Sequence, residues 1–397
     1  MQLLLAGLRF CSVEKMRDTI AGSLSLRNFQ SEALSALQKS GDGICVAPTG
    51  SGKSLIFEQH AKLSVARTLL ISPLVALVRQ QTLKFLKIGV KTYSFHQIQK
   101  AGREPGVCLT SPEALFHQGY ESGLEKVRNW KPDFIVVDEA HCVWEWGSGF
   151  RPSFSFLPRF VSQMGPRNSL WLTATLTREM RENLKRQLAP RPFWELGKFQ
   201  LPKSLGLRLV KIPLVDGPLA LKLWLDKNMG GGIIFVHSRQ STARLALLIQ
   251  ALGRNPICYH AGMSAEERRS IESHLHSGKG DILVATSAFG MGMDFTSLDW
   301  VLLWQMPSSV LSFTQMVGRV GRSVKSGTAL CFWHDDDFRL LEWLTHLPNG
   351  EGSRRSLQEL YEIALSDTCR EQILQQYFDV ESQPHPCGRC DVCELKL

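Results

Sequence analysis

The sequence has no apolar run that approaches the roughly 20 residues a helix needs to span a bilayer. Its apolar opening, Met1 to Leu8, has no basic segment before it and is interrupted by Arg9, so we do not expect a secretory signal. We interpret this stretch as the start of a helix, or as an extension upstream of a start at Met16. The sequence therefore predicts a protein that is not integral to a membrane.

Low-complexity segments and short repeats are also missing, which excludes a solenoid. The 397 residues are 44% hydrophobic and 21% charged, a composition that allows a large core divided among two or three domains. Lysine and arginine exceed aspartate and glutamate by 46 to 37, giving a net charge of +9. This modest excess suits a polyanionic partner but does not by itself establish one.

The ten cysteines divide into two groups that call for different explanations. Four crowd the C-terminus, and the other six lie scattered through apolar segments, as small buried residues usually do. This division favours one metal site and a reducing compartment over disulfides. We therefore expect a cytoplasmic protein, associated with the nucleoid if the source is bacterial. The scattered group is Cys11, Cys45, Cys108, Cys142, Cys258 and Cys331.

Short apolar or β-branched runs alternate with amphipathic stretches from about residue 26 to 345, a pattern typical of parallel α/β architecture. Two series of such runs flank a connector expected at 197–217, so the chain should form a tandem with a cleft between its halves. We expect strands at 43–47, 68–72, 107–110, 134–138 and 169–173, and then at 232–237, 256–260, 281–286, 300–305 and 327–332.

A different pattern begins near residue 349, with two helices expected near 356–364 and 368–378 and a cysteine cluster after them. We place a third, small helical domain there. The predicted domains are therefore residues 1–200, 201–345 and 346–397.

The run APTGSGKS at residues 47–54 follows an expected strand and precedes an expected helix, the context that a phosphate-binding loop requires. Glycines in such a loop let backbone N–H groups approach phosphate oxygens, its lysine reaches the β- and γ-phosphates, and its serine can ligate Mg²⁺. A chance Gly/Ser turn is the alternative, and Ala47 stands where the strict pattern has glycine. The expected nucleotide ligands are Thr49, Gly50, Ser51, Gly52, Lys53 and Ser54.

Asp138 and Glu139 end the apolar run at 134–137, which places both carboxylates at the C-terminal edge of a sheet, where α/β proteins bind ligands. Asp138 is expected to hold Mg²⁺, and Glu139 to orient or deprotonate an attacking water. An acidic pair after a strand is often only a helix N-cap. The phosphate-binding loop upstream favours the catalytic interpretation.

The second half contains the run QMVGRVGR at 315–322. Arg319 and Arg322, three residues apart, share one helix face and can point together at a phosphate chain across a cleft. An arginine so placed neutralises transition-state charge and can contribute about 10³ to 10⁵ in rate. A basic, solvated helix face is the alternative. We expect Gln315, Arg319 and Arg322 to act with the carboxylates.

Taken in order, these elements resemble the RecQ family of superfamily 2 helicases, from about Leu26 to Cys393. The resemblance implies two RecA-like domains, ATP as the nucleotide and DNA as the partner. It implies adenine contacts at Gln30 and Arg27, and a place near the ribose or the interdomain cleft for Asp294. The runs SPLVAL at 72–77, TSPE at 110–113, TAT at 173–175, YHAG at 259–262 and ATSAFGMGMD at 285–294 resemble further motifs of that family.

The run HCVWEWGSGFRPSF at 141–154 resembles the aromatic-rich loop that in this family couples single-strand binding to ATP hydrolysis. Trp144, Trp146 and Phe150 offer stacking faces for bases, at about 1 to 3 kcal/mol each, and Arg151 offers a cation beside them. Packing against the other domain is the alternative. Other positions depart from the family: serine and glycine at 148–149 replace its usual His-Asp pair, which bears on how tightly DNA controls hydrolysis, and valine at 320 and serine at 323 are lesser changes.

Four cysteines near the C-terminus can complete a tetrahedral Zn²⁺ shell, since two-residue spacers let neighbouring thiolates turn onto one ion. His385 is a fifth candidate, and a redox dithiol is the competing interpretation of a Cys-x-x-Cys pair. The resemblance favours zinc, and a closed shell implies a structural metal. The expected ligands are Cys369, Cys387, Cys390 and Cys393.

The resulting hypothesis is a 3′-to-5′ DNA helicase serving repair or recombination, with polarity inherited from the resemblance. Single-stranded and branched or tailed DNA are the expected partners, bound by a monomer mainly through phosphates. Only four residues follow Cys393, so the winged-helix and terminal helical domains of many relatives are not expected. Three alternatives stay open: a DNA-stimulated translocase or remodeller that unwinds weakly, a DNA-binding module without turnover, and an RNA helicase.

Overall fold

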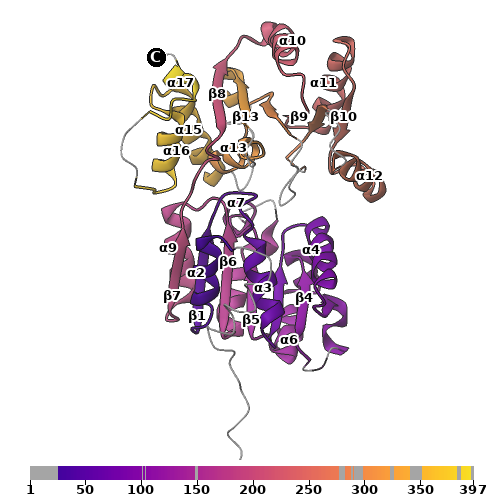
Figure 1. Ribbon diagram of the computed structural model, residues 1–397, viewed down its shortest axis with the longest axis vertical. Helices are drawn as coiled ribbons and strands as arrows, with labels where there is room; N and C mark the ends of the chain where they lie inside the picture. The colour runs from indigo at the N-terminus through magenta and orange to yellow at the C-terminus, as the bar shows by residue number, and fades with distance from the viewer. Residues whose placement is uncertain are drawn as a thin grey trace, which may run out of the picture.

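The computed structural model describes residues 26–100, 102, 104–147, 151–276, 282–287, 289, 298–321, 326–339, 351–381 and 386–394, with only the backbone described for residue 276 and for 351–353. Two α/β lobes lie one above the other along the long axis, and a small helical module lies beside the upper lobe (Figure 1). Within these ranges, no helix combines the length and the apolar character needed to cross a membrane.

The first lobe is built on a seven-stranded parallel sheet in the order β3-β4-β2-β5-β6-β1-β7. All residues of β1, β5 and β6 are buried, as expected for strands covered on both faces. Its strands are β1 (Gly41–Val46), β2 (Arg67–Ile71), β3 (Thr92–Ser94), β4 (Gly106–Thr110), β5 (Phe134–Val137), β6 (Asn168–Thr173) and β7 (Phe193–Gly197).

Helices cover both faces of this sheet and divide its core into two apolar clusters. One face packs against α2 (Asn28–Ala36), α3 (Ser54–Leu63) and α4 (Val75–Lys87). The other packs against α6 (Tyr120–Trp130), α8 (Leu157–Met164) and α9 (Arg178–Leu188). The shorter elements are η1 (Phe95–Lys100), α5 (Pro112–Leu115), α7 (Cys142–Glu145) and η2 (Pro152–Phe154).

The second lobe has a six-stranded parallel sheet in the order β10-β11-β9-β12-β13-β8. Its strands are β8 (Leu205–Lys211), β9 (Gly232–Phe235), β10 (Pro256–Tyr259), β11 (Ile282–Ala285), β12 (Trp300–Leu303) and β13 (Gly327–Trp333). Its other elements are η3 (Leu214–Asp216), α10 (Gly217–Lys227), α11 (Arg239–Ala251), α12 (Ala265–His276) and α13 (Val310–Val317). The predicted tandem of parallel α/β domains is confirmed.

The structure differs from the sequence-based expectation mainly between residues 193 and 211. Two strands form there, β7 at the edge of the first sheet and β8 at the edge of the second, where we had expected mostly a connector. Both are edge strands and are only partly buried, so their sequences lack the continuous apolar run that marks a central strand. The short strand β3, also at an edge, was not expected either.

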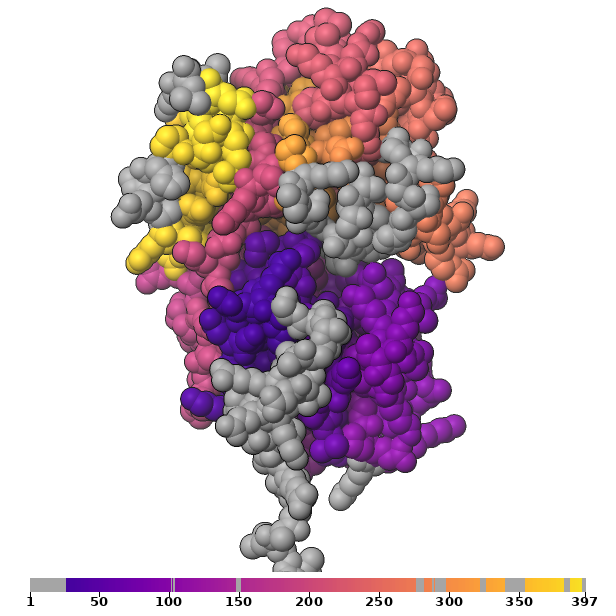
Figure 2. All heavy atoms as spheres, in the orientation of Figure 1, coloured from indigo at the N-terminus to yellow at the C-terminus, as the bar shows by residue number. Residues whose placement is uncertain are grey.

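The helical module consists of α15 (Glu351–Leu365), α16 (Arg370–Tyr377) and α17 (Asp391–Glu394). It packs beside β8, as the yellow atoms against the pink strand region show in Figure 2. The backbone N–H of Leu207 donates to the carbonyl of Arg389 at 3.3 Å, and Arg208 donates to both carboxylate oxygens of Glu394 at 2.7 Å. One apolar cluster spans the second lobe and this module, so the module extends the core of that lobe.

Candidate nucleotide and nucleic-acid site

The loop between β1 and α3 has the backbone shape of a phosphate-binding loop. Gly50 and Gly52 adopt positive φ angles of 76° and 82°, a region that glycine enters without strain. A Cβ atom on Gly52 would lie 2.8 Å from Nε2 of Gln30, so that position also lacks room for a side chain. The backbone conformation of the loop therefore favours glycine at both positions.

Lys53 is buried within this loop, at the point where α3 begins with Ser54. Its ammonium donates hydrogen bonds to the carbonyl of Ala47 at 2.8 Å and to that of Pro48 at 3.2 Å. These acceptors hold the positive charge at the loop, where phosphate oxygens can take their place. The N-terminus of α3 points into the same loop, so the helix dipole adds to the attraction for an anion.

Gln30 and Arg27, for which the resemblance implied adenine contacts, lie beside the loop. Gln30 is buried; its Nε2 donates to the carbonyl of Gly52 at 2.9 Å, and its Oε1 accepts from the backbone N–H of Arg27 at 2.9 Å. A cavity of about 760 Å³ opens next to them and is lined from both lobes, including Arg27, Thr49, Lys198 and Gly321. Its volume is that of a typical small-molecule site.

Asp138 and Glu139 follow β5 at the C-terminal edge of the sheet, as predicted. Burial, and next the charge of Glu139, raise the pKa of Asp138 to about 7, while the nearby Lys53 opposes this shift. Oδ1 of Asp138 accepts the backbone N–H of Glu139 at 3.0 Å. A half-buried carboxylate beside the phosphate-binding loop is a suitable oxygen donor for Mg²⁺, so the residues present fit that ion.

His141 connects this acidic pair to the second lobe. The Nδ1 atom of His141 lies 3.2 Å from Oγ1 of Thr173 and 3.5 Å from Oε2 of Glu139, and its Nε2 lies 2.5 Å from Nε2 of Gln315. Burial lowers the pKa of His141, which keeps the imidazole neutral. A single tautomer satisfies all these contacts: Gln315 donates to Nε2, and Nδ1–H donates to Thr173, whose hydroxyl donates to the carbonyl of Thr175 at 2.8 Å.

Arg319 lies just beyond the end of α13 and is buried. It lines a cavity between the lobes together with Gln315 and Glu145, and its positive charge lowers the pKa of His141, after the larger effect of burial. The structure therefore brings Gln315 and Arg319 to the side of the cleft that carries Glu139. Arg322 and Asp294, the other two predicted residues of the second lobe, lie outside the described residues.

A second cavity, of about 790 Å³, lies between the lobes and is lined by both. Arginines from three helices contribute to its wall, which makes it a suitable channel for a phosphate backbone. Sequence reasoning missed most of this lining; its only signal was basic residues on helices next to the family-like motifs. These arginines are Arg79, Arg239, Arg268 and Arg269.

The aromatic segment that includes α7 and the residues after it is packed more tightly than its sequence predicted. Trp146 is only 9% exposed. The centres of its ring and of the Phe154 ring are 5.3 Å apart, and the guanidinium carbon of Arg151 lies 4.6 Å from the ring centre of Trp146. Trp144 is half-buried and donates from Nε1 to Oδ1 of Asn183 at 3.4 Å. Phe150 lies outside the described residues, as do residues 148 and 149.

Arg151 joins three segments that resembled family motifs. Besides covering Trp146, it forms an ion pair with Glu113 and donates from Nη2 to the carbonyl of Pro73 at 2.7 Å. The loop and the two first-lobe motifs thus meet at one guanidinium. Trp146 and Arg151 both line the interlobe cavity, so these motifs lie along its wall.

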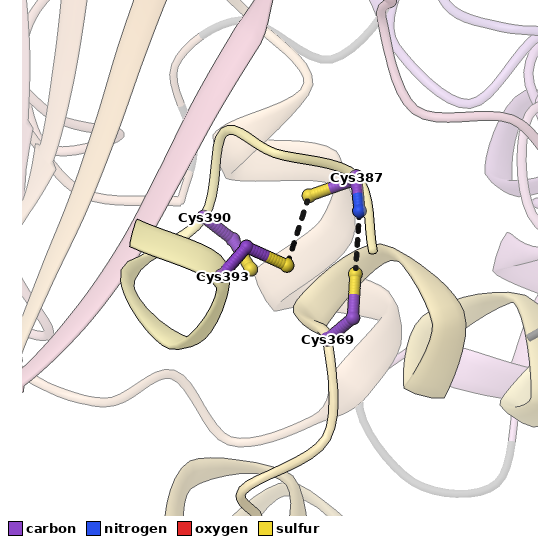
Figure 3. A group of neighbouring side chains, drawn as sticks. All are labelled: Cys369, Cys387, Cys390 and Cys393. Carbon is purple, nitrogen blue, oxygen red and sulfur yellow. Dashed lines mark hydrogen bonds between the residues drawn. The ribbon is translucent and has the colours of Figure 1, made fainter. Parts of the chain in front are cut away.

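The four predicted cysteine ligands converge in the helical module, with the sulfur atoms pointing toward a common centre (Figure 3). The sulfurs all lie within 4.8 Å of one another, and those of Cys387 and Cys393 are 4.0 Å apart. A tetrahedral ion with Zn–S bonds of about 2.3 Å requires sulfurs roughly 3.8 Å apart, so the cluster fits Zn²⁺. His385 lies outside the described residues.

Local hydrogen bonds lower the pKa of one thiol of this cluster, Cys369, whereas burial raises the pKa of Cys387 and of Cys390. Burial alone would raise the pKa of the Cys369 thiol, but hydrogen bonds from the backbone N–H groups of Gln372 and Cys387 bring it down to about 7. Next to the cluster, the buried Arg370 forms a 3.0 Å ion pair with Asp391 and donates to the carbonyl of Ser366 at 2.9 Å. These bonds connect α15, α16 and α17 around the sulfurs.

Comparison with known protein families gives three matches in chain order. Residues 27–183 match the DEAD/DEAH box helicase family, residues 218–324 the helicase conserved C-terminal domain, and residues 336–394 the RecQ zinc-binding domain. Among solved structures, the DUF1998 helicase MrfA bound to DNA and AMPPNP is similar, with a TM-score of 0.62 and 23% identity over 83% of this chain and 51% of that one. The DEAD-box helicase Mss116 bound to ssRNA and UDP-BeF is also similar, with a TM-score of 0.65 and 18% identity over 86% of this chain and 79% of that one.

Similar curated proteins cover nearly the whole of this chain. The ATP-dependent DNA helicase RecQ of Pasteurella multocida is 28% identical over 94% of this chain and 61% of its own length. The putative ATP-dependent DNA helicase Q1 of Caenorhabditis briggsae is 30% identical over 93% of this chain and 63% of its own length. The chain thus spans somewhat over three fifths of these relatives. In the order of its three domain matches, and over nearly its whole length, the chain is thus similar to the RecQ helicases.

Proposed function

We propose that this protein is an ATP-dependent DNA helicase that moves 3′ to 5′ along single-stranded DNA and unwinds duplexes in repair or recombination. The contact between His141 and Gln315 carries the proposal, because it places α13 of the second lobe against the acidic pair of the first. ATP hydrolysis in such a site depends on both lobes, so a change in their separation can be coupled to movement. The names of the relatives support DNA as the nucleic acid.

Each lobe would contribute distinct groups to hydrolysis. Lys53 and the loop N–H groups would hold the phosphates, while Ser54 and Asp138 would hold Mg²⁺, which supplies charge neutralisation. Glu139 would orient the attacking water, and Gln315, Arg319 and Arg322 would face the phosphates from the second lobe. Gln30 and Arg27 would contact adenine, and Asp294 would lie near the ribose.

The cavity between the lobes would hold the single strand. Its arginines offer phosphate contacts from both lobes, so affinity should be salt-dependent and nearly independent of sequence. Trp144, Trp146, Phe150 and Arg151 would sense the strand from the first lobe. We further propose that the partners are single-stranded DNA and branched or tailed DNA, and that the protein acts as a monomer. We place it in the cytoplasm or at the nucleoid, and we place the domain limits at 200/201 and 345/346.

ATP hydrolysis measured with and without single-stranded DNA tests the proposal. We expect hydrolysis by the zinc-replete protein to rise with DNA and to be lost in Lys53→Ala, whereas Lys62→Ala, on the exposed face of the same helix, should behave as wild type. Unwinding of 3′-tailed but not 5′-tailed duplexes would establish polarity. Hydrolysis without unwinding would favour a translocase. Absence of hydrolysis would favour a DNA-binding module, and stimulation of hydrolysis by RNA alone would favour an RNA helicase.

A further inference from the structure

Glu145 joins α7 to the first turn of α13, next to the contact that His141 makes with Gln315. His141, the N-cap of α7, and Glu145 are four residues apart and share a face, as do Ser312 and Gln315 on α13. His141 contacts Gln315, and Glu145 contacts Ser312. Two matched contacts about one helical turn apart fix both the position and the rotation of one helix against the other, whereas a single contact would leave it free to pivot.

The carboxylate of Glu145 binds the first turn of α13. Its Oε1 accepts from Oγ of Ser312 at 2.7 Å and from Oγ of Ser309 at 3.2 Å. Ser309 is the N-cap of α13, and its Oγ accepts the backbone N–H of Ser312 at 3.0 Å. The Glu145 side chain is 17% exposed, so these bonds meet little competition from water. The negative charge also suits the positive end of the helix dipole.

We propose that Glu145 is a positioning residue for ATP hydrolysis, which holds α13 in the register that presents Gln315 and Arg319 to the acidic pair. The inference rests on the proposed function. Glu145 also lines the interlobe cavity next to Trp146. It therefore connects the aromatic segment, which we propose to sense the DNA strand, directly to α13, the helix that reaches the nucleotide site. Because its carboxylate is bonded to the first turn of α13, Glu145 influences the nucleotide site through that helix.

A double-mutant cycle in the full chain tests this inference. Glu145→Ala and Ser312→Ala should each lower the DNA-stimulated kcat, Glu145→Ala by about tenfold, with KM for ATP changed by less than about twofold. The double variant should be no slower than Glu145→Ala, because the contact is already lost. Glu145→Gln keeps Oε1 as an acceptor for both serines and should retain most of the activity. Ser270→Ala, an exposed serine on α12, is the matched control.

The rates are normalised to bound nucleotide, which removes any contribution from misfolded protein. Any one of three results would overturn the inference. They are a double variant whose kcat is lowered by the product of the two single losses, a Glu145→Ala variant with the kcat of wild type, and a Glu145→Gln variant as slow as Glu145→Ala. Hydrogen exchange of residues 309–317 provides a readout that needs no activity: Glu145→Ala should speed exchange there, and Glu145→Gln should not. A wild type that hydrolyses no ATP would refute the proposed function, and exchange alone would then decide whether Glu145 holds α13.

Discussion

Gln315 donates a hydrogen bond from its side-chain amide to Nε2 of His141, at 2.5 Å across the two lobes. Because the other nitrogen of His141 faces Thr173, whose hydroxyl bonds to the carbonyl of Thr175, a continuous chain of hydrogen bonds runs from α13 to the end of β6. Residues 173–175 are one of the runs that resemble motifs of the helicase family. The chain of hydrogen bonds provides a physical route by which a movement of α13 can reach this run.

Gln315→Ala is expected to slow ATP hydrolysis by roughly 10- to 100-fold, because it leaves the buried Nε2 of His141 without its donor. The reduction should appear in kcat, since Gln315 lies on the opposite lobe from the phosphate-binding loop. Steady-state hydrolysis with saturating DNA measures it, and Gln250→Ala, exposed on α11, serves as the control. A variant that hydrolyses ATP as fast as wild type would refute this role.

Cys390→Ser is expected to abolish zinc binding and to unfold the helical module, because the cluster of four sulfurs joins the loop before α17 to the start of α16. Metal analysis should find one zinc per wild-type chain and none in the variant, and hydrogen exchange should show loss of protection in α15 to α17. Cys258→Ser, in β10, should keep the metal. Retained zinc in Cys390→Ser would contradict the four-cysteine site.

Trp146→Ala is expected to lower the free energy of unfolding by about 3 to 5 kcal/mol, the usual cost of removing a buried aromatic ring. The ring is buried between Phe154 and Arg151, so it behaves as core in this conformation. Trp146→Phe keeps an aromatic contact and should lose less than about 1.5 kcal/mol. Denaturant unfolding measures both. Unchanged stability together with weakened DNA binding would instead favour an exposed, base-stacking Trp146.

His60 makes stability depend on pH. Burial lowers its pKa from 6.5 to about 4, and its ring packs 4.4 Å from that of Phe134. The unfolded chain therefore binds more protons than the folded chain between these pH values, so stability is fully present above pH 6.5 and is lost as the pH falls toward 4. From pH 7 to pH 5 the free energy of unfolding should fall by about 2 kcal/mol from this residue alone.

The comparison of His60→Leu with wild type isolates this contribution. His141 and His237 also have pKa values lowered by burial, so they add pH dependence of the same sign in both proteins. Denaturant unfolding between pH 5 and 7.5 should give a shallower slope for the variant. Parallel slopes for the two proteins would contradict the lowered pKa of His60.

Central strands could be predicted from the sequence. Of the four edge strands in the two described sheets, β10 was predicted, whereas β3, β7 and β8 were not. The apolar run at 134–137 marks β5 because a strand covered on both faces must be apolar throughout. In β7 and β8 the side chains are only partly buried, and Pro202 and Gly206 nearby resemble the punctuation of a loop. Their strand character comes from pairing with β1 and β13, partners far away in the sequence.

The sequence by itself determined the groups that require a local arrangement of backbone or side chains. The loop at 47–54 and the acidic pair after β5 are each contiguous, and the two-residue spacers of Cys387, Cys390 and Cys393 bring those sulfurs together within a short segment. In each case short-range geometry alone places the atoms. The fold class, the likeness to helicases and the cysteine cluster were accordingly recognisable from the order and spacing of the residues.

Only the tertiary structure decided which groups meet across the lobes and which aromatic rings are buried. The pairs His141–Gln315 and Glu145–Ser312 join residues more than 160 positions apart, so no local pattern can reveal them. Trp146 lost its expected exposure because Phe154 and Arg151 cover it, and Arg151 is held there by Glu113 from a third segment. Such contacts depend on how whole sheets and helices pack, and that packing is a property of the folded chain.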